Sequence, residues 1–328
     1  MTDPGFWIFV GVVAGIFAIF ALGLQIQLGF TGLLNFGHVA FMAIGAYTMA
    51  ILVVRTEMSI WLAGLIAIVV SMAFGLLIGL PTLRLRDDYL AITTIAFGEM
   101  VRYFALNLQG LTGGPQGTIN LAGSGRAVSY NGEWVQFQRR VQGWLESLLG
   151  DTFLGEYINP NFTMMVIVWI VVIALILFLQ RTVNSPYGRV LRSIREDEDA
   201  ASALGKNVFS YKLQALAIGA AIGALAGLFY AWQFSFFSPI DFLPLQTFFA
   251  YVIVLLGGLA RNWAVPVGAI IFAVIFAGTR FLNFWPLTEF DSGERAYLRL
   301  IIVGLILILL MAFRPQGIFG RRQEMALE

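Results

Sequence analysis

The sequence predicts an all-α fold: a polytopic membrane helix bundle of about nine spans in which the second span is broken. Of the 328 residues, 59% are hydrophobic and 12% are charged, and that charged share is about half the usual one for soluble domains. Several apolar stretches reach the roughly 20 residues that a membrane-spanning helix needs. We expect residues 1–328 to form a single transmembrane domain.

The apolar stretches are separated by short charged or turn-forming segments, which set the limits of the spans. The first stretch has no basic residues before it and no small-residue cleavage pattern after it, so we interpret it as a retained span and not as a signal peptide. The expected spans cover residues 6–27, 39–54, 60–80, 89–108, 162–179, 213–232, 247–259, 265–282 and 296–313.

Glycines and polar residues at 29–38 interrupt an otherwise continuous apolar stretch before the second span. Irregular backbone at membrane depth is tolerated only where it is buried in protein or lines a cavity, and broken helices are typical of substrate pathways. Asn35 and His38 lie where this break enters the span, so both are candidate pathway residues. The alternatives are a helix cap for Asn35 and a hydrogen-bonded core side chain for His38.

The fourth expected span carries an unusual polar load for a membrane helix. Thr93, Thr94 and Glu99 are further candidates for the substrate pathway. Threonines in helices commonly bond their own backbone, which is the structural alternative for the first two. Pairing with Arg102, three residues along the same helix, is the alternative for Glu99.

Residues 109–160 are the one long polar stretch of the chain. Apolar residues recur at helical spacing in its second half, which predicts an amphipathic helix lying in the membrane interface. Core packing within the segment is an equally good interpretation. The apolar positions are Phe137, Val141, Trp144, Leu145 and Leu148.

The densest run of charge lies at 185–207, between two apolar stretches. It reads as one short helix, with Ser185 as a possible cap, Pro186 at the first helical position and Gly205 as the stop. Two interpretations are open: a solvated loop between spans, or a docking element for a soluble partner. Its apolar face holds Val190, Ile194, Ala201 and Leu204.

The chain lacks the common signatures of catalysis and nucleotide binding. There is no cysteine and a single histidine, which excludes thiolate-ligated and multi-histidine metal sites. No phosphate-binding loop, G-x-S-x-G or H-E-x-x-H sequence occurs. We therefore expect no catalytic residue, no metal and no cofactor in this chain, and the net charge of +1 argues against a nucleic-acid partner.

The basic residues favour one orientation, because Lys and Arg concentrate on the cytoplasmic side. With alternating spans, the residues 84–88 and 185–207 share the cytoplasmic face, and 109–160 faces outward. The amino terminus is then outside and the carboxyl terminus inside. The basic residues expected inside are Arg84, Arg86, Arg181, Arg189, Arg192, Arg195, Lys206, Lys212, Arg261, Arg314, Arg321 and Arg322.

The chain resembles the LivM-type permease subunits of branched-chain amino-acid (LivH/LivM family) ABC importers. The resemblance rests on motifs in the family's order along nearly the whole chain. Two departures are visible: residues 260–263 replace a glycine-rich run, and the outward loop at 118–160 is longer than in the plainest members. The matching stretches are residues 29–41, 45–47, 83–99, 111–115, 187–205, 257–259 and 314–320.

The resemblance implies a set of partners. A LivH-like second permease subunit would complete the translocation path, and two cytoplasmic ATP-binding subunits, which hold the ATP and Mg, would drive it. A periplasmic substrate-binding protein would deliver substrate, and the chain would lie among the lipids of the bacterial inner membrane. The 185–207 segment would be the coupling helix that contacts the ATPase. Its expected contact residues are Val190, Ile194, Glu196, Asp199, Ala200, Ala201, Leu204 and Gly205.

The implied function is uptake of branched-chain or other neutral amino acids, without enzymatic activity in this chain. A urea or short-amide permease of the same type is the nearest alternative, since the substrate-binding protein largely sets specificity. A stand-alone secondary carrier would need paired acidic groups in its spans, for which Glu99 is the sole candidate. A scaffold protein would not need broken helices.

Overall fold

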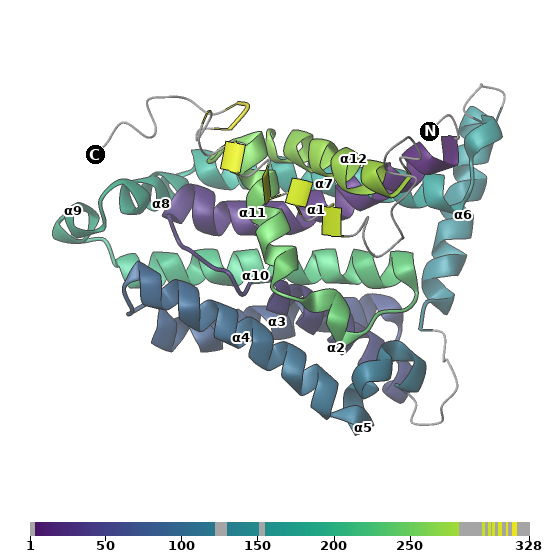
Figure 1. The fold of residues 1–328 in the computed structure, drawn as a ribbon, viewed down its shortest axis with the longest axis horizontal. Helices are drawn as coiled ribbons and strands as arrows, with labels where there is room; N and C mark the ends of the chain where they lie inside the picture. Colours follow the sequence, from purple (N-terminus) through teal and green to yellow (C-terminus); the bar gives the residue numbers. More distant parts are fainter. Residues whose placement is uncertain are drawn as a thin grey trace.

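The computed structural model describes residues 4–121, 130–150 and 155–281, together with short stretches between 297 and 319. In these parts the regular elements are helices, and no strand occurs among them. Five helices are long and apolar enough to cross a membrane, which agrees with the predicted all-α membrane bundle (Figure 1). They are α1 (Pro4–Thr31), α2 (Val39–Thr56), α3 (Ile60–Thr82), α7 (Pro160–Asn184) and α10 (Val208–Phe234).

The remaining elements are shorter or carry more polar residues. Helix α4 has the length of a span but includes charged side chains, and α11 has 13 residues, so at about 1.5 Å per residue it is too short to cross a hydrocarbon core of about 30 Å. The expected span at 296–313 falls largely outside the described residues. The α-helices are α4 (Asp87–Asn107), α5 (Gln109–Thr112), α6 (Gly132–Leu149), α8 (Pro186–Glu196), α9 (Glu198–Ala203), α11 (Leu245–Gly257) and α12 (Val265–Phe281). The 3-10 helices are η1 (Gly114–Asn120), η2 (Gly155–Tyr157) and η3 (Pro239–Phe242).

Helix α10 is the centre of the bundle and packs against α1, α2 and α3 (Figure 1). Glycines permit the close approach: a methyl group on Gly227 would stand 2.1 Å from the Met42 carbonyl oxygen, and one on Gly45 would stand 2.6 Å from the backbone of Ala224. Small residues at such crossings let helix backbones approach closely, which is how membrane helices gain packing energy. On the other side of α1 lie α7 and α12.

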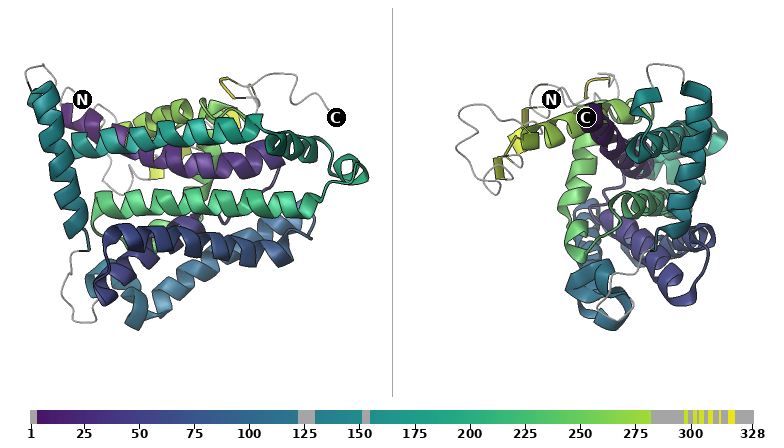
Figure 2. Two further views of the ribbon diagram at one scale, coloured as in Figure 1. Left: turned by 180° about the vertical axis from the view of Figure 1, so that it is seen from behind. Right: turned by 90° about the vertical axis from the view of Figure 1, so that its right-hand side faces the viewer.

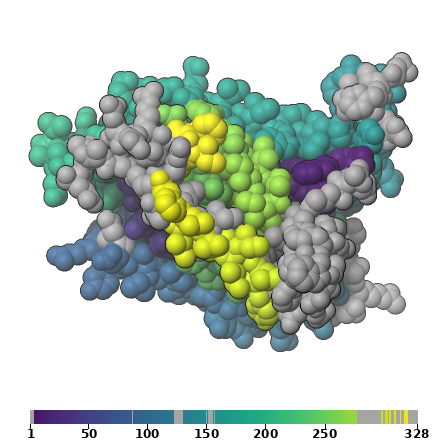
Figure 3. All heavy atoms as spheres, turned by 45° about the horizontal axis from the view of Figure 1, so that its top comes forward, coloured from purple at the N-terminus to yellow at the C-terminus, as the bar shows by residue number. Residues whose placement is uncertain are grey.

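The two ends of the bundle carry different elements (Figure 1). The turn between α3 and α4 lies at the same end as α8 and α9, while α5, α6 and the start of α1 lie at the opposite end. In Figure 3, α8 and α9 form the teal-green projection at the left. This relative placement is the one that alternating spans predict.

Helix α6 lies across one end of the bundle, roughly perpendicular to α7 and α10 (Figure 2). The Trp134 ring stacks on Trp232 of α10, with centroids 4.3 Å apart. Trp144 and Leu148, in contrast, are more than 60% exposed. Helix α6 thus packs on the bundle through Trp134 and exposes Trp144 and Leu148, while Leu145 is buried; its place in the membrane interface stays a prediction.

The carboxylate of Glu133, in the first turn of α6, caps the start of α3. Its Oε2 accepts hydrogen bonds from the Ser59 hydroxyl at 2.8 Å and from the Ile60 backbone N–H at 2.7 Å. The first N–H groups of a helix have no partner within the helix, and a negative charge there is favourable. This contact fixes the start of α6 to the start of α3.

Candidate functional site

The break predicted before the second span is present and lies deep in the bundle. Helix α1 ends at Thr31, residues 32–35 are irregular, and α2 begins at Val39. His38 Nε2 is 3.2 Å from the carbonyl oxygen of Phe20, eleven residues before the end of α1. At about 1.5 Å per residue, the chain has returned roughly 16 Å along α1 before α2 starts. Helix α2 therefore begins inside the bundle, level with about the middle of α1.

Three side chains from different parts of the chain cap the start of α2. Asn35 Oδ1 accepts from the Gly37 N–H at 3.0 Å within the break itself. Thr94 Oγ1 on α4 accepts from the Phe36 N–H at 3.1 Å, and Thr247 Oγ1 on α11 accepts from the Val39 N–H at 3.0 Å. All three acceptor side chains are buried. The start of α2 is thus bonded to α4 and to α11 at once.

Two buried glutamines near the end of α1 extend this network. Gln27 Oε1 accepts from Asn35 Nδ2 at 2.8 Å. In the amide orientation that satisfies its neighbours, the Gln25 side-chain oxygen accepts from the N–H groups of Arg261 and Ala260 at 2.8 and 3.0 Å. These bonds join the region of the break to the turn between α11 and α12.

Sequence reasoning missed Gln25, Gln27 and Thr247 as members of the site. Both glutamines are fully buried near the end of an apolar stretch. A buried amide in a membrane span is costly unless it is hydrogen-bonded, so two glutamines two residues apart were a usable signal. Thr247 gave no comparable signal, because its partner lies 208 residues away.

His38 is completely buried at the start of α2. Its ring stacks on Phe20, with centroids 4.8 Å apart, and meets Phe41 edge-on. Nδ1 has no hydrogen-bond partner in the described part of the chain. This geometry corresponds to the packed-core alternative, and a pathway role for His38 stays a prediction.

Of the two candidate threonines, only Thr94 joins the break. The Thr93 hydroxyl donates to carbonyls of its own helix, to Tyr89 at 2.6 Å and Leu90 at 3.1 Å. Thr94 also donates within α4, to Ala91 at 2.9 Å, while its oxygen accepts from Phe36. Thr94 thereby connects α4 to the irregular segment, whereas the described contacts of Thr93 stay within α4.

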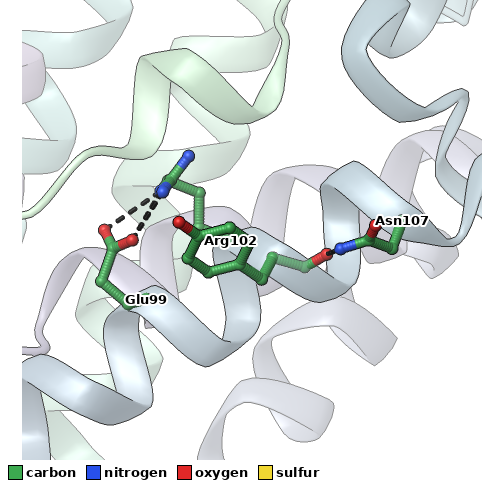
Figure 4. Close-up of polar contacts among 4 residues, drawn as sticks. Glu99, Arg102 and Asn107 are labelled. Carbon is green, nitrogen blue, oxygen red and sulfur yellow. Dashed lines mark hydrogen bonds and ion pairs between the residues drawn. The ribbon is translucent and has the colours of Figure 1, made fainter.

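Glu99 pairs with Arg102 one turn along α4 (Figure 4). The Arg102 guanidinium donates to both carboxylate oxygens of Glu99: Nε is 3.0 Å from Oε1 and Nη2 is 2.6 Å from Oε2. Two-point contacts of this kind are among the stronger ion pairs. The charge of Glu99 is compensated within its own helix, which is the structural alternative that the sequence left open.

The 185–207 segment forms two helices and not the single helix predicted from the sequence. Helix α8 ends at Glu196, and Asp197 adopts an extended conformation with φ −157°. The Asp197 carboxylate accepts from the Ala200 N–H at 2.9 Å and so caps α9. An aspartate competes well as a helix cap, and here that preference outweighs continuation of α8. Gly205 follows with a left-handed φ of +78°, as its predicted stop position requires.

The apolar face of this segment points mainly into the chain itself. Ile194 and Ala201 are 3% and 2% exposed and pack with Val208 of α10, so neither side chain lies on the surface. Leu204 is 79% exposed. That a partner holds this face stays a prediction. Of the eight predicted contact residues, the exposed ones are Glu196, Asp199, Ala200, Leu204 and Gly205, and Val190 is half-buried.

Helix α8 is fastened to the end of α1, just before the break. Arg195 Nη1 donates to the Gly29 carbonyl at 2.7 Å, and Leu191 packs in a buried cluster with Phe30. A cation at a helix C-terminus is favourable, because the last carbonyls lack partners within the helix. In the same cluster, burial raises the pKa of Tyr187 to about 12.

No metal-binding cluster occurs in the part of the chain that the structure describes, where no three His, Cys, Asp or Glu side chains converge. The polar groups at the break are amides, hydroxyls and backbone groups, which suit hydrogen bonding. These groups bond one another, and so they fix the start of α2 relative to α4 and α11.

Comparison with known proteins identifies the family. Residues 7–311 match the family model described as the branched-chain amino acid transport system / permease component. The chain belongs to this family. The members of this family are transport permease subunits and not enzymes. Together with the apolar helices, this family membership indicates a multi-pass inner-membrane protein.

Individual relatives include both types of subunit. The permease is 34% identical over 318 residues to the high-affinity branched-chain amino acid transport system permease protein LivM of Salmonella typhimurium, which covers 94% of this chain and 69% of that protein. It is 27% identical over 326 residues to LivH of Escherichia coli, covering 95% and 94%. A nucleoside ABC transporter permease, NupC of Lactococcus lactis, is 24% identical over 75% of this chain and 71% of its own. No solved structure matches significantly.

Proposed function

We propose that this permease is the LivM-type transmembrane subunit of an ABC importer for branched-chain or other neutral amino acids. Residues 1–328 act as a single transmembrane domain that pairs with a LivH-like second subunit. The similarity to LivM and LivH proteins along almost the whole chain supports this pairing of related subunits.

Energy comes from two cytoplasmic ATP-binding subunits that bind ATP and Mg. We propose that α8 and α9 contact them through the exposed side chains Glu196, Asp199 and Leu204. The amino terminus then lies outside and the carboxyl terminus in the cytoplasm. Helix α6 faces the periplasm, where the substrate-binding protein docks. The placement of α6 and α8 at opposite ends of the bundle supports this arrangement.

The observation that carries the proposal is the helix that begins inside the bundle. Broken helices near the bilayer midplane present free backbone groups to substrates, and irregular backbone is tolerated there for that purpose. In our proposal Asn35 and Thr94 are the pathway residues at the break, and His38, Thr93 and Glu99 are further pathway residues on α2 and α4 beside it. A shift of α4 relative to α11 changes the bonds that hold the start of α2.

Uptake by the reconstituted importer tests the function. The permease is purified with its co-expressed partner subunits and placed in liposomes with ATP on the ATPase side and the binding protein on the other. We expect leucine uptake that requires ATP hydrolysis, and competition by valine and alanine. Uptake that persists without ATP and follows an ion gradient would establish a secondary carrier instead. Uptake of urea in preference to leucine would establish the short-amide alternative.

A further inference from the structure

The irregular segment between α1 and α2 has one buried face and one open face. Leu33 and Asn35 are each 2% exposed, whereas Gly32, Leu34 and Phe36 are only partly buried. This alternation is that of an extended chain, whose successive side chains point to opposite sides. The segment runs from the end of α1 back to a point level with the middle of α1, near Phe20. Because α1 is long enough to cross the membrane, the open face lies at membrane depth.

Among the described residues, part of the backbone at the open face is unpaired: the N–H groups of Gly32 and Phe36 are bonded, to Leu28 and Thr94, but the Leu34 N–H and the carbonyl oxygens are not. Leu34 forms no hydrogen bond through its N–H or its carbonyl in the described part of the chain. In the same described part of the chain, no hydrogen-bond donor lies within bonding distance of a carbonyl oxygen of residues 32–36. Each such group costs several kcal/mol in hydrocarbon, where neither water nor another donor is present. The open face therefore cannot face lipid.

The outer surface of α7 shows the contrasting case. Ile170, Ile173 and Leu177 are at least half exposed, and they belong to a continuous helix whose backbone groups pair within the helix. Such a surface suits lipid tails. The surface at residues 32–36 has the opposite requirement, because it needs hydrogen-bond donors.

Aromatic rings border the open face. Phe36 stacks on Tyr251, with centroids 4.6 Å apart, and lies 5.3 Å from the ring of Phe248. Phe248 is 41% exposed. A strip of carbonyl oxygens beside an aromatic surface matches an amphipathic solute. The carbonyls can accept from an ammonium group, and the rings can contact an aliphatic side chain.

We propose that the open face of residues 32–36 lines the water-filled translocation path and forms a contact site for the transported amino acid. The carbonyl oxygens of residues 32–36 accept from its ammonium group, and Phe36 and Phe248 contact its aliphatic side chain. This inference rests on the proposed function. Water in the path satisfies the unpaired carbonyls when no substrate is present.

Cysteine accessibility tests whether the face is wet. The chain contains no cysteine, so single variants can be read without background. In the assembled importer we expect Leu34→Cys to react rapidly with a charged, membrane-impermeant methanethiosulfonate. The matched controls Ile173→Cys, on the outer face of α7, and Leu33→Cys, buried beside Leu34, should stay unmodified. We also expect saturating leucine to slow modification of Leu34→Cys several-fold.

Two outcomes would overturn the inference. If Leu34→Cys is inert in the assembled importer but reactive in the isolated permease, the second subunit covers this face and it is no path. If it is as unreactive as Ile173→Cys in both, the face is closed to water. Neither outcome affects ATP-driven uptake, so the proposed function can stand when the inference fails. Accessibility is likewise measurable without transport, so the inference can be judged if the function fails.

A specificity measurement tests the aromatic contact. Phe248→Ala removes an exposed ring, so we expect the fold to tolerate it. The KM for leucine should rise roughly tenfold relative to that for alanine, since only the larger side chain reaches the ring. An equal change for both substrates, or no change for either, would refute the contact.

Discussion

Replacing Gly37 by alanine should separate α4 from the start of α2. A Cβ on Gly37 would stand 2.0 Å from the Thr94 carbonyl oxygen and 2.8 Å from its carbon. Contacts under 3.0 Å are not tolerated, and the obstacle is backbone, which cannot rotate away. The backbone of α4 must therefore move outward by about 1 Å.

That shift has a calculable cost. It stretches the bond between the Phe36 N–H and Thr94 Oγ1 from 3.1 Å to about 4 Å, beyond hydrogen-bonding range. Leaving the N–H unpaired costs about 1–3 kcal/mol, and the overpacking itself costs about 1–3 kcal/mol. We expect a total destabilisation of about 2–6 kcal/mol and loss of transport, because the start of α2 loses its link to α4.

Thermal unfolding of the purified permease in lipid nanodiscs, with uptake measured in parallel, provides the assay. Thr94→Val removes the same hydrogen bond without the clash and should cost less than Gly37→Ala. Gly143→Ala is the matched control, since a Cβ there meets nothing within 4 Å and favours the helix. If Gly37→Ala is as stable and active as Gly143→Ala, the packing of α4 on the break is not as we describe it.

Three further changes probe the contacts at the two ends of the bundle. Arg195→Met removes the hydrogen bond to the Gly29 carbonyl, so we expect leucine uptake per ATP hydrolysed to fall roughly tenfold while the ATPase stays associated. The control is Arg189→Met, which changes an exposed side chain. An unchanged ratio of uptake to ATP hydrolysis would contradict this prediction. Leu204→Asp alters a 79% exposed side chain and should weaken ATPase association in pull-down experiments without lowering the unfolding temperature; full association would remove Leu204 from the interface. Glu133→Ala removes the cap of α3 and should cost about 1–2 kcal/mol in unfolding measurements, against no cost if the cap is unimportant.

The broken span could be predicted from the sequence because its signal is local. Glycines and polar residues interrupt an apolar stretch within ten positions. The partners of the break could not be predicted, because they are distant in the chain: Thr247 lies 208 residues from Val39, and Gln27 reaches the Leu216 carbonyl 189 residues away. A single sequence contains no record of such long-range hydrogen bonds.

The charged segment shows a different limit. Its periodicity correctly places Ile194 and Ala201 on one apolar face, but periodicity does not say what that face contacts. An apolar helix face can be buried either by a partner subunit or by a neighbouring helix of the same chain, and the sequence pattern is the same in both cases. Here Val208 of α10 packs against Ile194 and Ala201, which the structure shows and the sequence pattern does not.

In the proposed importer, the contacts of Arg195 and Thr94 provide a route by which movement of the ATPase could be transmitted to the break. Arg195 bonds Gly29 three residues before the break, and Thr94 bonds Phe36 within it, so both hold one short segment from opposite ends. If they act on it jointly, the double variant Arg195→Met/Thr94→Val should change the activation free energy of uptake non-additively, by about 0.5–3 kcal/mol. Independent sites would add within about 0.5 kcal/mol, and that result would mean that α8 does not act through the break.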